Sequence, residues 1–271
     1  MDDYDEFSFS VPHIKYVDCR HTAQVTLCNF QPPATARMKR VNDDFYFVYS
    51  TNELRLYDKE KAGTRGDHLS SIKRAFNGIK RIINCNYESP SHVRFLTLTY
   101  AENMQDNKRI SDDWRSFRRK LVKRYGSHEY LYVKEKQDRG AWHLHCVLFF
   151  DCPAPWMDND EVRGLWGHGF VNIQGFEDDI NNLGNYLCAY LTDDKDTSKK
   201  GARLVNYESG VRLYNCSRGI KRPTEAVISF DQYTEMISNG DLVQISAKDS
   251  DRRVPSGKMI HCRYELYRVD N

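Results

Sequence analysis

Apolar positions recur with a helical period in three segments of this 271-residue chain. Residues 67–83 place them every three or four positions behind Asp67, a residue type that caps helix starts, and leave a basic outer face. Residues 111–126 and 177–191 follow the same pattern, so three amphipathic helices are predicted. Their apolar positions are Leu69, Ile72, Phe76, Ile79 and Ile83; Trp114, Phe117, Leu121, Val122 and Tyr125; and Ile180, Leu183, Leu187 and Leu191.

Other segments show the alternation or the β-forming residues typical of strands. These segments are residues 92–100, 129–137, 140–150 and 167–176. A short "QDRG" turn joins the second to the third, which predicts an antiparallel hairpin over 129–150. This order of elements predicts an α+β domain over about residues 90–222, with an antiparallel sheet and helices on one face.

The two ends of the chain carry less information. Residues 1–66 hold short mixed strands and turns, and residues 61–67 read as a loop. We therefore expect three parts: an N-terminal segment over 1–90 that is possibly integrated with the core, a core over 91–223 and a C-terminal accessory segment over 224–271.

Composition indicates a globular protein, since 40% of the residues are apolar and 13% are aromatic. The acidic start and the absence of a long apolar run argue against secretion and membrane spanning, so a cytoplasmic location is expected. Eight cysteines without a CxxC pair are typical of free thiols. A structural zinc site built from scattered cysteines and histidines is the less favoured alternative.

Positive charge is concentrated in two runs, although the formal net charge is only +2. Residues 108–124 and residues 199–222 each carry about +6. One such run is usually a solvated face, but two runs around one candidate site favour binding to a nucleic acid. The expected phosphate contacts are Arg118, Arg119, Lys123, Lys221 and Arg222.

The stretch "EKQDRGAWHLHCVLFF" over residues 135–150 carries candidate metal ligands. Side chains alternate along a strand, so His143 and His145 share one face, and Glu135 lies on the neighbouring strand of the hairpin. Two imidazoles and one carboxylate suit a divalent ion with open positions for a phosphate oxygen. The alternative is that both histidines are polar residues on the wetter face of a half-buried strand.

Tyr186 and Tyr190 lie four residues apart on the third predicted helix, so they share one side of it. Their offset from the leucine stripe favours a partly exposed face, which leaves aromatic packing as the alternative.

Three motifs together resemble the HUH endonucleases that initiate rolling-circle replication. They are "FLTLTY" (95–100), "WHLH" (142–145) and "YLCAY" (186–190). "HGFVNI" (168–173) and "SRGIKRP" (217–223) resemble the initiators of bacterial plasmids, phages and integrated elements. The resemblance implies a five-stranded antiparallel sheet, with Glu135, His143 and His145 as ligands of Mg²⁺ or Mn²⁺. It also implies a nucleophilic Tyr186, with Tyr190 as a second catalytic tyrosine; the lysine that often stands within this motif is Ala189 here.

The implied activity is nicking and rejoining of single-stranded origin DNA through a 5′-phosphotyrosine intermediate and a free 3′-hydroxyl primer, in the bacterial cytoplasm. Nothing resembles a GxxxxGK[ST] helicase motif, so a host helicase and polymerase are expected partners. The alternatives are a relaxase-like or transposase-like HUH enzyme, a metal hydrolase without covalent catalysis, and a non-catalytic DNA-binding protein.

Overall fold

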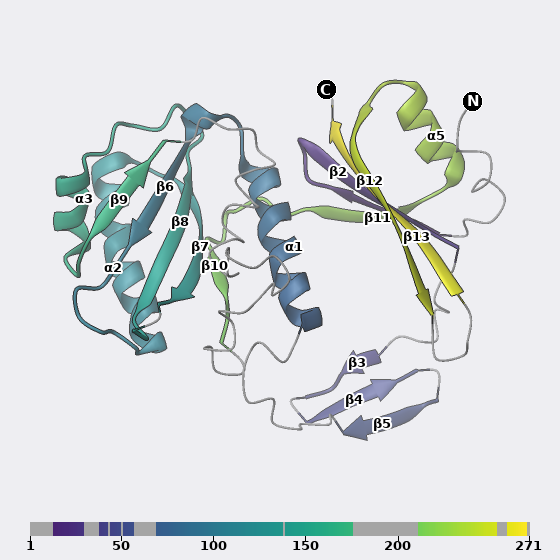
Figure 1. Ribbon diagram of the computed structural model, residues 1–271, viewed down its shortest axis with the longest axis horizontal. Helices are drawn as coiled ribbons and strands as arrows, with labels where there is room; N and C mark the ends of the chain where they lie inside the picture. The colour runs from purple at the N-terminus through teal and green to yellow at the C-terminus, as the bar shows by residue number, and fades with distance from the viewer. Residues whose placement is uncertain are drawn as a thin grey trace. The chain divides into compact units, whose positions relative to one another are not determined.

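The computed structural model describes residues 13–29, 38–42, 44–49, 51–56, 69–137, 139–175, 211–253 and 259–269 (Figure 1). The chain divides into two compact units. Unit 1 combines residues 1–61 with 223–271, and unit 2 spans residues 62–222. The expected functional division at residues 90 and 223 stays a prediction.

A five-stranded antiparallel sheet forms the centre of unit 2, in the order β10-β7-β8-β6-β9. Its strands are β6 (Val93–Leu98), β7 (Glu129–Lys136), β8 (Trp142–Phe149), β9 (Val171–Gln174) and β10 (Tyr214–Cys216). The predicted hairpin is present as β7 and β8, paired in register along their whole length. The expected α+β class with an antiparallel sheet of about five strands is therefore confirmed.

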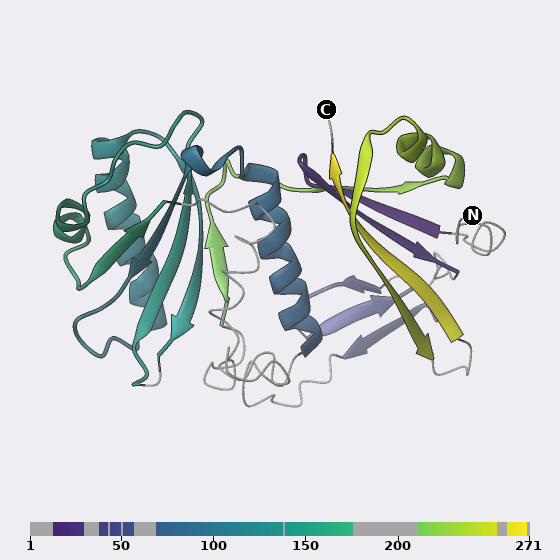
Figure 2. The same cartoon turned by 45° about the horizontal axis from the view of Figure 1, so that its top comes forward.

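Helices α1 (Leu69–Asn86) and α2 (Asn107–Tyr125) lie on opposite faces of this sheet (Figures 1 and 2). On one face, the Trp114 ring of α2 lies 4.8 Å from the ring of Tyr130 in β7. On the other, Gly78 of α1 lies against the Tyr214 hydroxyl of β10, so closely that an added Cβ would lie 2.9 Å from it. The expectation of helices on one face only is wrong, because the unit 2 sheet is apolar on both faces and each needs a cover.

Helix α2 begins earlier than the apolar period indicated. The Asp106 side chain accepts a hydrogen bond from the backbone N–H of Lys108, which caps the helix start. Gly126 ends it with φ 90°, a conformation that favours glycine. The apolar stripe of α2 faces the core of unit 2: Ile110, Trp114, Phe117 and Leu121 are buried. The short helix α3 (Asn159–Trp166) packs beside α2 and β9.

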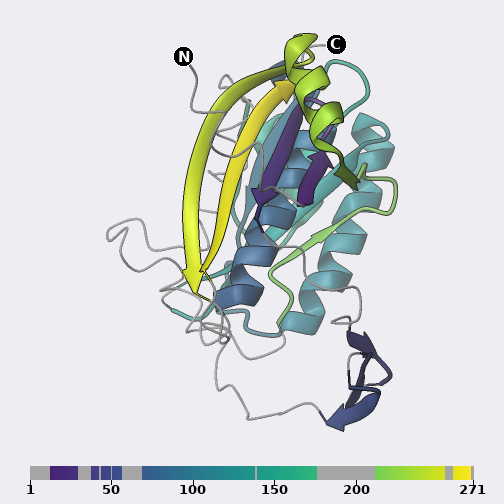
Figure 3. The same ribbon diagram turned by 90° about the vertical axis from the view of Figure 1, so that its right-hand side faces the viewer.

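Unit 1 contains a second five-stranded antiparallel sheet, in the order β11-β1-β2-β13-β12. The two ends of the chain meet in it, since β2 pairs with β13. In Figure 3, β12 and β13 run side by side as a long ribbon, with α5 (Phe230–Ser238) near one end. The strands are β1 (His13–Asp18), β2 (Thr22–Cys28), β11 (Thr224–Ile228), β12 (Leu242–Arg253) and β13 (Met259–Val269); a small separate sheet holds β3 (Met38–Arg40), β4 (Phe45–Val48) and β5 (Glu53–Leu56).

Two of the cysteines are joined rather than free. Cys28 of β2 and Cys262 of β13 are directly paired residues of the unit 1 sheet and form a disulfide. The expectation of free thiols is wrong for this pair, because 234 residues separate the two in sequence and only the sheet brings them together. Cys19, Cys85 and Cys146 are buried free thiols, as expected.

Among the helices that the structure describes, none is both long and apolar enough to cross a membrane.

Candidate metal centre and nucleic-acid interface

The β7–β8 hairpin brings Glu135, His143 and His145 together. Glu135 is directly opposite His143 in the ladder, and Val133 is opposite His145, so all three polar side chains share one face. One ligand atom from each residue lies within 4.8 Å of the others. The proximity that the sequence predicted is therefore present in the fold.

Glu135 and His145 are the buried members of this cluster, with exposed fractions of 6% and 3%. The Glu135 Oε2 atom lies 2.6 Å from His145 Nε2, at hydrogen-bond distance. A buried carboxylate and a buried imidazole are costly to desolvate without such a partner. The pair therefore stabilises the arrangement of the cluster even before any ion binds.

His143 is partly exposed, and burial lowers the pKa of its imidazole to about 4; the charges of His145 and Arg139 also lower it, and that of Glu135 opposes them. A neutral imidazole has a lone pair free for a cation. At neutral pH this side chain is therefore in the state that binds a metal ion.

Strand β6 supports the cluster from the other side of β8. Thr97 is directly opposite His145, and its hydroxyl lies 3.3 Å from His145 Nδ1. The Phe95 ring is stacked on the His145 ring with centroids 6.0 Å apart. Together they fix the ring that carries Nε2. Sequence reasoning missed Thr97 as a positioning residue, although its place within "FLTLTY" and the strand alternation were available signals.

The donor set fits a divalent cation. Two imidazole nitrogens and a carboxylate oxygen suit first-row divalent ions, and three protein ligands leave coordination positions for other oxygens. The identity of the ion is not fixed by this set, because imidazole also binds zinc.

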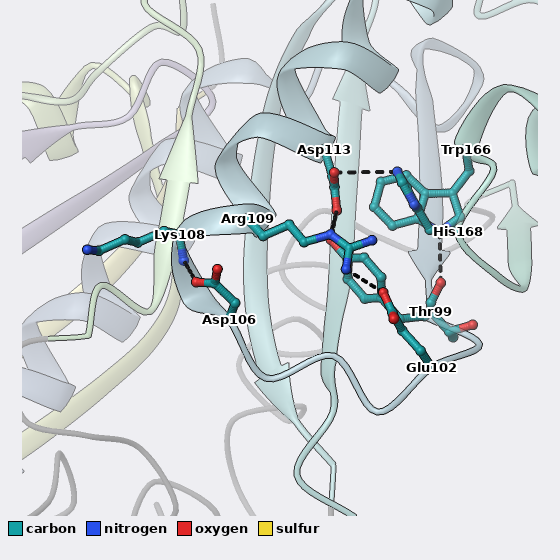
Figure 4. Close-up of polar contacts among 9 residues, drawn as sticks. Thr99, Glu102, Asp106, Lys108, Arg109, Asp113, Trp166 and His168 are labelled. Carbon is teal, nitrogen blue, oxygen red and sulfur yellow. Dashed lines mark hydrogen bonds and ion pairs between the residues drawn. The ribbon is translucent and has the colours of Figure 1, made fainter.

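The beginning of the loop after β6 is held by a second polar network (Figure 4). Asp113 of α2 accepts a hydrogen bond from the Tyr100 hydroxyl and lies 3.3 Å from Arg109 Nε and 3.5 Å from His168 Nε2. The Trp166 indole N–H donates to the carbonyl of Thr99 at 2.7 Å. These contacts connect the end of β6 to α2 and to the "GHGF" segment.

Gly169 within this segment allows two backbones to approach closely. An added Cβ would lie 2.6 Å from both Ala101 N and Thr99 O. The flanking residues hydrogen-bond the same stretch, since Ala101 N–H donates to His168 O and Thr99 N–H donates to Phe170 O. The "HGF" motif therefore has a structural role in joining β9 to the end of β6.

The expected basic residues lie on two elements of unit 2. Arg118, Arg119 and Lys123 are on α2, where Arg119 and Lys123 are exposed, and the Arg118 guanidinium lies over the Tyr130 ring at 5.3 Å. Lys221 and Arg222 are exposed and follow β10. The Lys221 backbone is held by the Asn86 side chain, with hydrogen bonds of 2.8 and 2.9 Å.

Tyr186 and Tyr190 lie outside the described residues, as does the whole predicted helix over 177–191. Their placement relative to the Glu135, His143 and His145 cluster stays a prediction.

Comparison with known proteins supports the sequence interpretation. Residues 93–195 match the family model of the replication-associated protein ORF2. The phasyl DNA replicon protein arp of Escherichia coli is 26% identical over 144 residues, covering 43% of this chain and 50% of that protein. The chain thus aligns with about half the length of this curated relative. No solved structure gives a significant match.

The matched residues begin at β6 and include α2, the β7–β8 hairpin with its polar cluster, α3 and β9. They contain the motifs on which the resemblance was based. Residues 93–195 therefore belong to this family of replication-associated proteins, and the chain is similar to rolling-circle initiators of the Rep type.

Proposed function

We propose that this protein initiates replication by nicking and rejoining single-stranded DNA at an origin. The observation that carries the proposal is the convergence of Glu135, His143 and His145 on one sheet face, within the residues that match a replication-associated family. The proposed ligands would hold Mg²⁺ or Mn²⁺. Both ions accept carboxylate and phosphate oxygens.

The reaction is a transesterification. The phenolic oxygen of Tyr186 attacks the phosphorus of the scissile phosphodiester, a P–O(Tyr) bond forms, and the P–O3′ bond breaks. The phenol loses its proton and the departing 3′ oxygen gains one, so the products are a 5′-phosphotyrosine and a free 3′-hydroxyl. Because one ester replaces another, the reverse reaction rejoins the strand.

The residues of this chain prepare that step in three ways. Glu135 and Thr97 fix both nitrogens of the His145 ring, which keeps the ligand geometry constant. Burial keeps His143 neutral. An ion held there would polarise a non-bridging oxygen of the scissile phosphate. The basic residues of α2 and of the segment after β10 bind the backbone of the strand.

The proposed setting is the bacterial cytoplasm, with a host helicase to unwind the origin and a host polymerase to extend the 3′-hydroxyl. A relaxase-like or transposase-like HUH enzyme would use the same cluster and the same chemistry on a different DNA junction. A metal hydrolase would form no covalent adduct, and a purely DNA-binding protein would not cleave.

Covalent trapping tests this proposal. The full chain is incubated with Mg²⁺ or Mn²⁺ and a pool of 3′-labelled single-stranded oligonucleotides that tile the DNA around its own coding sequence. We expect a labelled band that resists denaturation, shifts to the mass of protein plus DNA and disappears with EDTA. Cleavage without an adduct would support the hydrolase, and intact DNA throughout would support the DNA-binding protein.

A further inference from the structure

A pocket of about 640 Å³ lies in unit 2 between α2 and the edge of the sheet formed by β7 and β10. Its position is on the sheet face opposite the metal cluster. Strand alternation places Tyr130 and Tyr132 of β7 on the other side from Glu135, and both tyrosines line the pocket beneath Trp114. The metal cluster and this pocket are therefore separate sites.

Four arginines line the pocket, and they come from both basic runs of the sequence. Arg115, Arg118 and Arg119 are on α2, and Arg218 is in the segment after β10. Arg115 is paired with Asp112 at 2.9 Å. Within the described part of the chain, the other three have no carboxylate partner. Unneutralised guanidinium groups around one hollow form a site for an anion, and phosphate fits their fork geometry.

The pocket wall also contains buried polar atoms without hydrogen-bond partners. Across the described residues there are five such side-chain atoms, and three belong to this wall: Trp114 Nε1, Arg118 Nε and Glu129 Oε2. Buried polar atoms are nearly always satisfied, and each unsatisfied one costs about 1–3 kcal/mol. Three of them around one pocket point to a ligand that supplies the missing partners.

The mixture of charges defines the ligand class. Glu129 repels a bare phosphate and accepts a hydrogen bond from an N–H group, whereas the arginines attract a phosphate. A ligand that satisfies both has an anionic end and an end with N–H donors. A nucleotide has both, and the volume is in the range of small-molecule sites, about 300–1,000 Å³.

We propose that this pocket binds one unpaired nucleotide, with its phosphate among Arg118, Arg119 and Arg218 and the N–H edge of its base on Glu129. Guanine is the best match, because its N1–H and N2–H donors lie side by side. The inference extends the proposed binding of a DNA strand to a second site away from the cleavage chemistry. The nucleotide is either part of that strand or a free mononucleotide, since both present the same chemistry.

Binding of dGMP and of inorganic phosphate to the full chain, measured by calorimetry in EDTA, tests the proposal. EDTA removes metal-dependent phosphate binding at the Glu135, His143 and His145 cluster. We expect dGMP to bind at least about tenfold more tightly than phosphate, since the base adds charge-assisted hydrogen bonds. Equal affinities for the two probes would overturn the assignment of a base contact.

Three variants locate the site. Arg218→Met should weaken both probes about tenfold or more, because it removes one of the guanidinium groups that bind the phosphate. Arg163→Met removes an exposed arginine of α3 that is paired with Asp160 and does not line the pocket, and it should change neither. Glu129→Gln should weaken dGMP and strengthen phosphate, because the negative charge that repels phosphate is removed. If both affinities move in the same direction, or if Arg218→Met leaves them unchanged, the proposal is wrong.

The source of the nucleotide follows from competition with a single-stranded oligonucleotide. Displacement of dGMP by the oligonucleotide, and not by one with abasic positions, identifies a nucleotide of the strand. Simultaneous binding of both identifies a free mononucleotide. Because these measurements need neither metal nor cleavage, failure of the pocket and failure of the proposed nicking activity are separate results.

Discussion

Glu135 Oε2 and His145 Nε2 lie 2.6 Å apart between neighbouring strands, in a diagonal rather than a directly opposite pair. The directly opposite partner of Glu135 is His143. The carboxylate therefore reaches toward the more buried of the two imidazoles, and the partly exposed His143 completes the cluster from the side. Polar groups of three residues thus meet at one point on a sheet face that is otherwise apolar.

Replacing His143 and His145 together by Ala should abolish DNA cleavage. We expect a loss of at least about 100-fold, because polarisation of a phosphate oxygen by a bound ion is worth several kcal/mol. Affinity for single-stranded DNA should change little, since the basic residues are unaffected. Cleavage is measured on the trapped origin oligonucleotide, and Mn²⁺ binding is measured by calorimetry. His261→Ala, at an exposed position in unit 1, is the matched control. Wild-type cleavage by the double variant would remove the cluster from the mechanism.

Binding of single-stranded DNA should weaken steeply with salt, because the protein releases counterions from the backbone. Neutral substitutions at Arg119 and Lys123, or at Lys221 and Arg222, should reduce the slope of log K against log salt by about one unit for each phosphate that is no longer bound. The reduction should be the same for different DNA sequences. Fluorescence anisotropy at several salt concentrations measures it. An unchanged slope would mean that these side chains only face solvent.

Tyr186→Phe should eliminate the covalent adduct, because it deletes only the attacking oxygen and keeps the ring. Tyr190→Phe should retain first-strand nicking and impair rejoining or a second transfer. The readout is the labelled protein band on a denaturing gel, with peptide mapping of the modified residue. A nucleotide mapped to Tyr190 in the unmodified protein would exchange the two roles without changing the enzyme class.

Gly169→Ala should destabilise unit 2 by about 2–4 kcal/mol, because the new methyl group would overlap the backbone at Thr99 and Ala101. Gly164→Ala is the matched control. Gly164 lies within α3 with no atom within 4 Å of an added Cβ, so this change should stabilise the helix by about 0.5–1 kcal/mol.

Urea unfolding followed by tryptophan fluorescence measures both glycine variants in the full chain. All four tryptophans of the sequence belong to unit 2, so the signal reports that unit alone. Equal effects of the two substitutions would contradict the close approach at Gly169.

Acid should destabilise unit 2 through His128. Burial lowers the pKa of this imidazole below its ordinary value of 6.5; the positive charge of Arg118 also lowers it, while the hydrogen bond to Gly126 O and the charge of Glu129 oppose the shift. The unfolded chain therefore binds a proton at a higher pH than the folded chain. Stability is lost as pH falls below about 6.5, with a slope of at most about 1.4 kcal/mol per pH unit for this one group.

The variant His128→Asn tests this pH dependence. Its amide can still donate to Gly126 O, but it does not titrate. We expect a shallower loss of stability below pH 6.5 than in the wild type, on top of a constant cost for the smaller side chain. His143, whose pKa is also lowered, contributes equally to both proteins and cancels in the difference. Parallel stability curves would show that His128 does not carry the effect.

The sequence by itself determined the local parts of the site. Glu135, His143 and His145 belong to one hairpin with a short turn, so strand alternation and the register of neighbouring residues were enough to place them on one face. The helix over 111–126 was predicted from its apolar period for the same reason. Its start at Asn107 was not, because capping by Asp106 extends the helix beyond the periodic residues.

Only the tertiary structure decided which distant segments meet. Thr97 contacts a histidine 48 residues away because β6 pairs with β8, and Arg218 joins Arg118 in one pocket because β10 pairs with β7. Cys28 reaches Cys262 in the same way, through the pairing of β2 with β13. A periodic pattern fixes which face of an element is apolar, but many strand orders bury the same faces. The order that is adopted depends on packing across the whole unit, which no local stretch of sequence encodes.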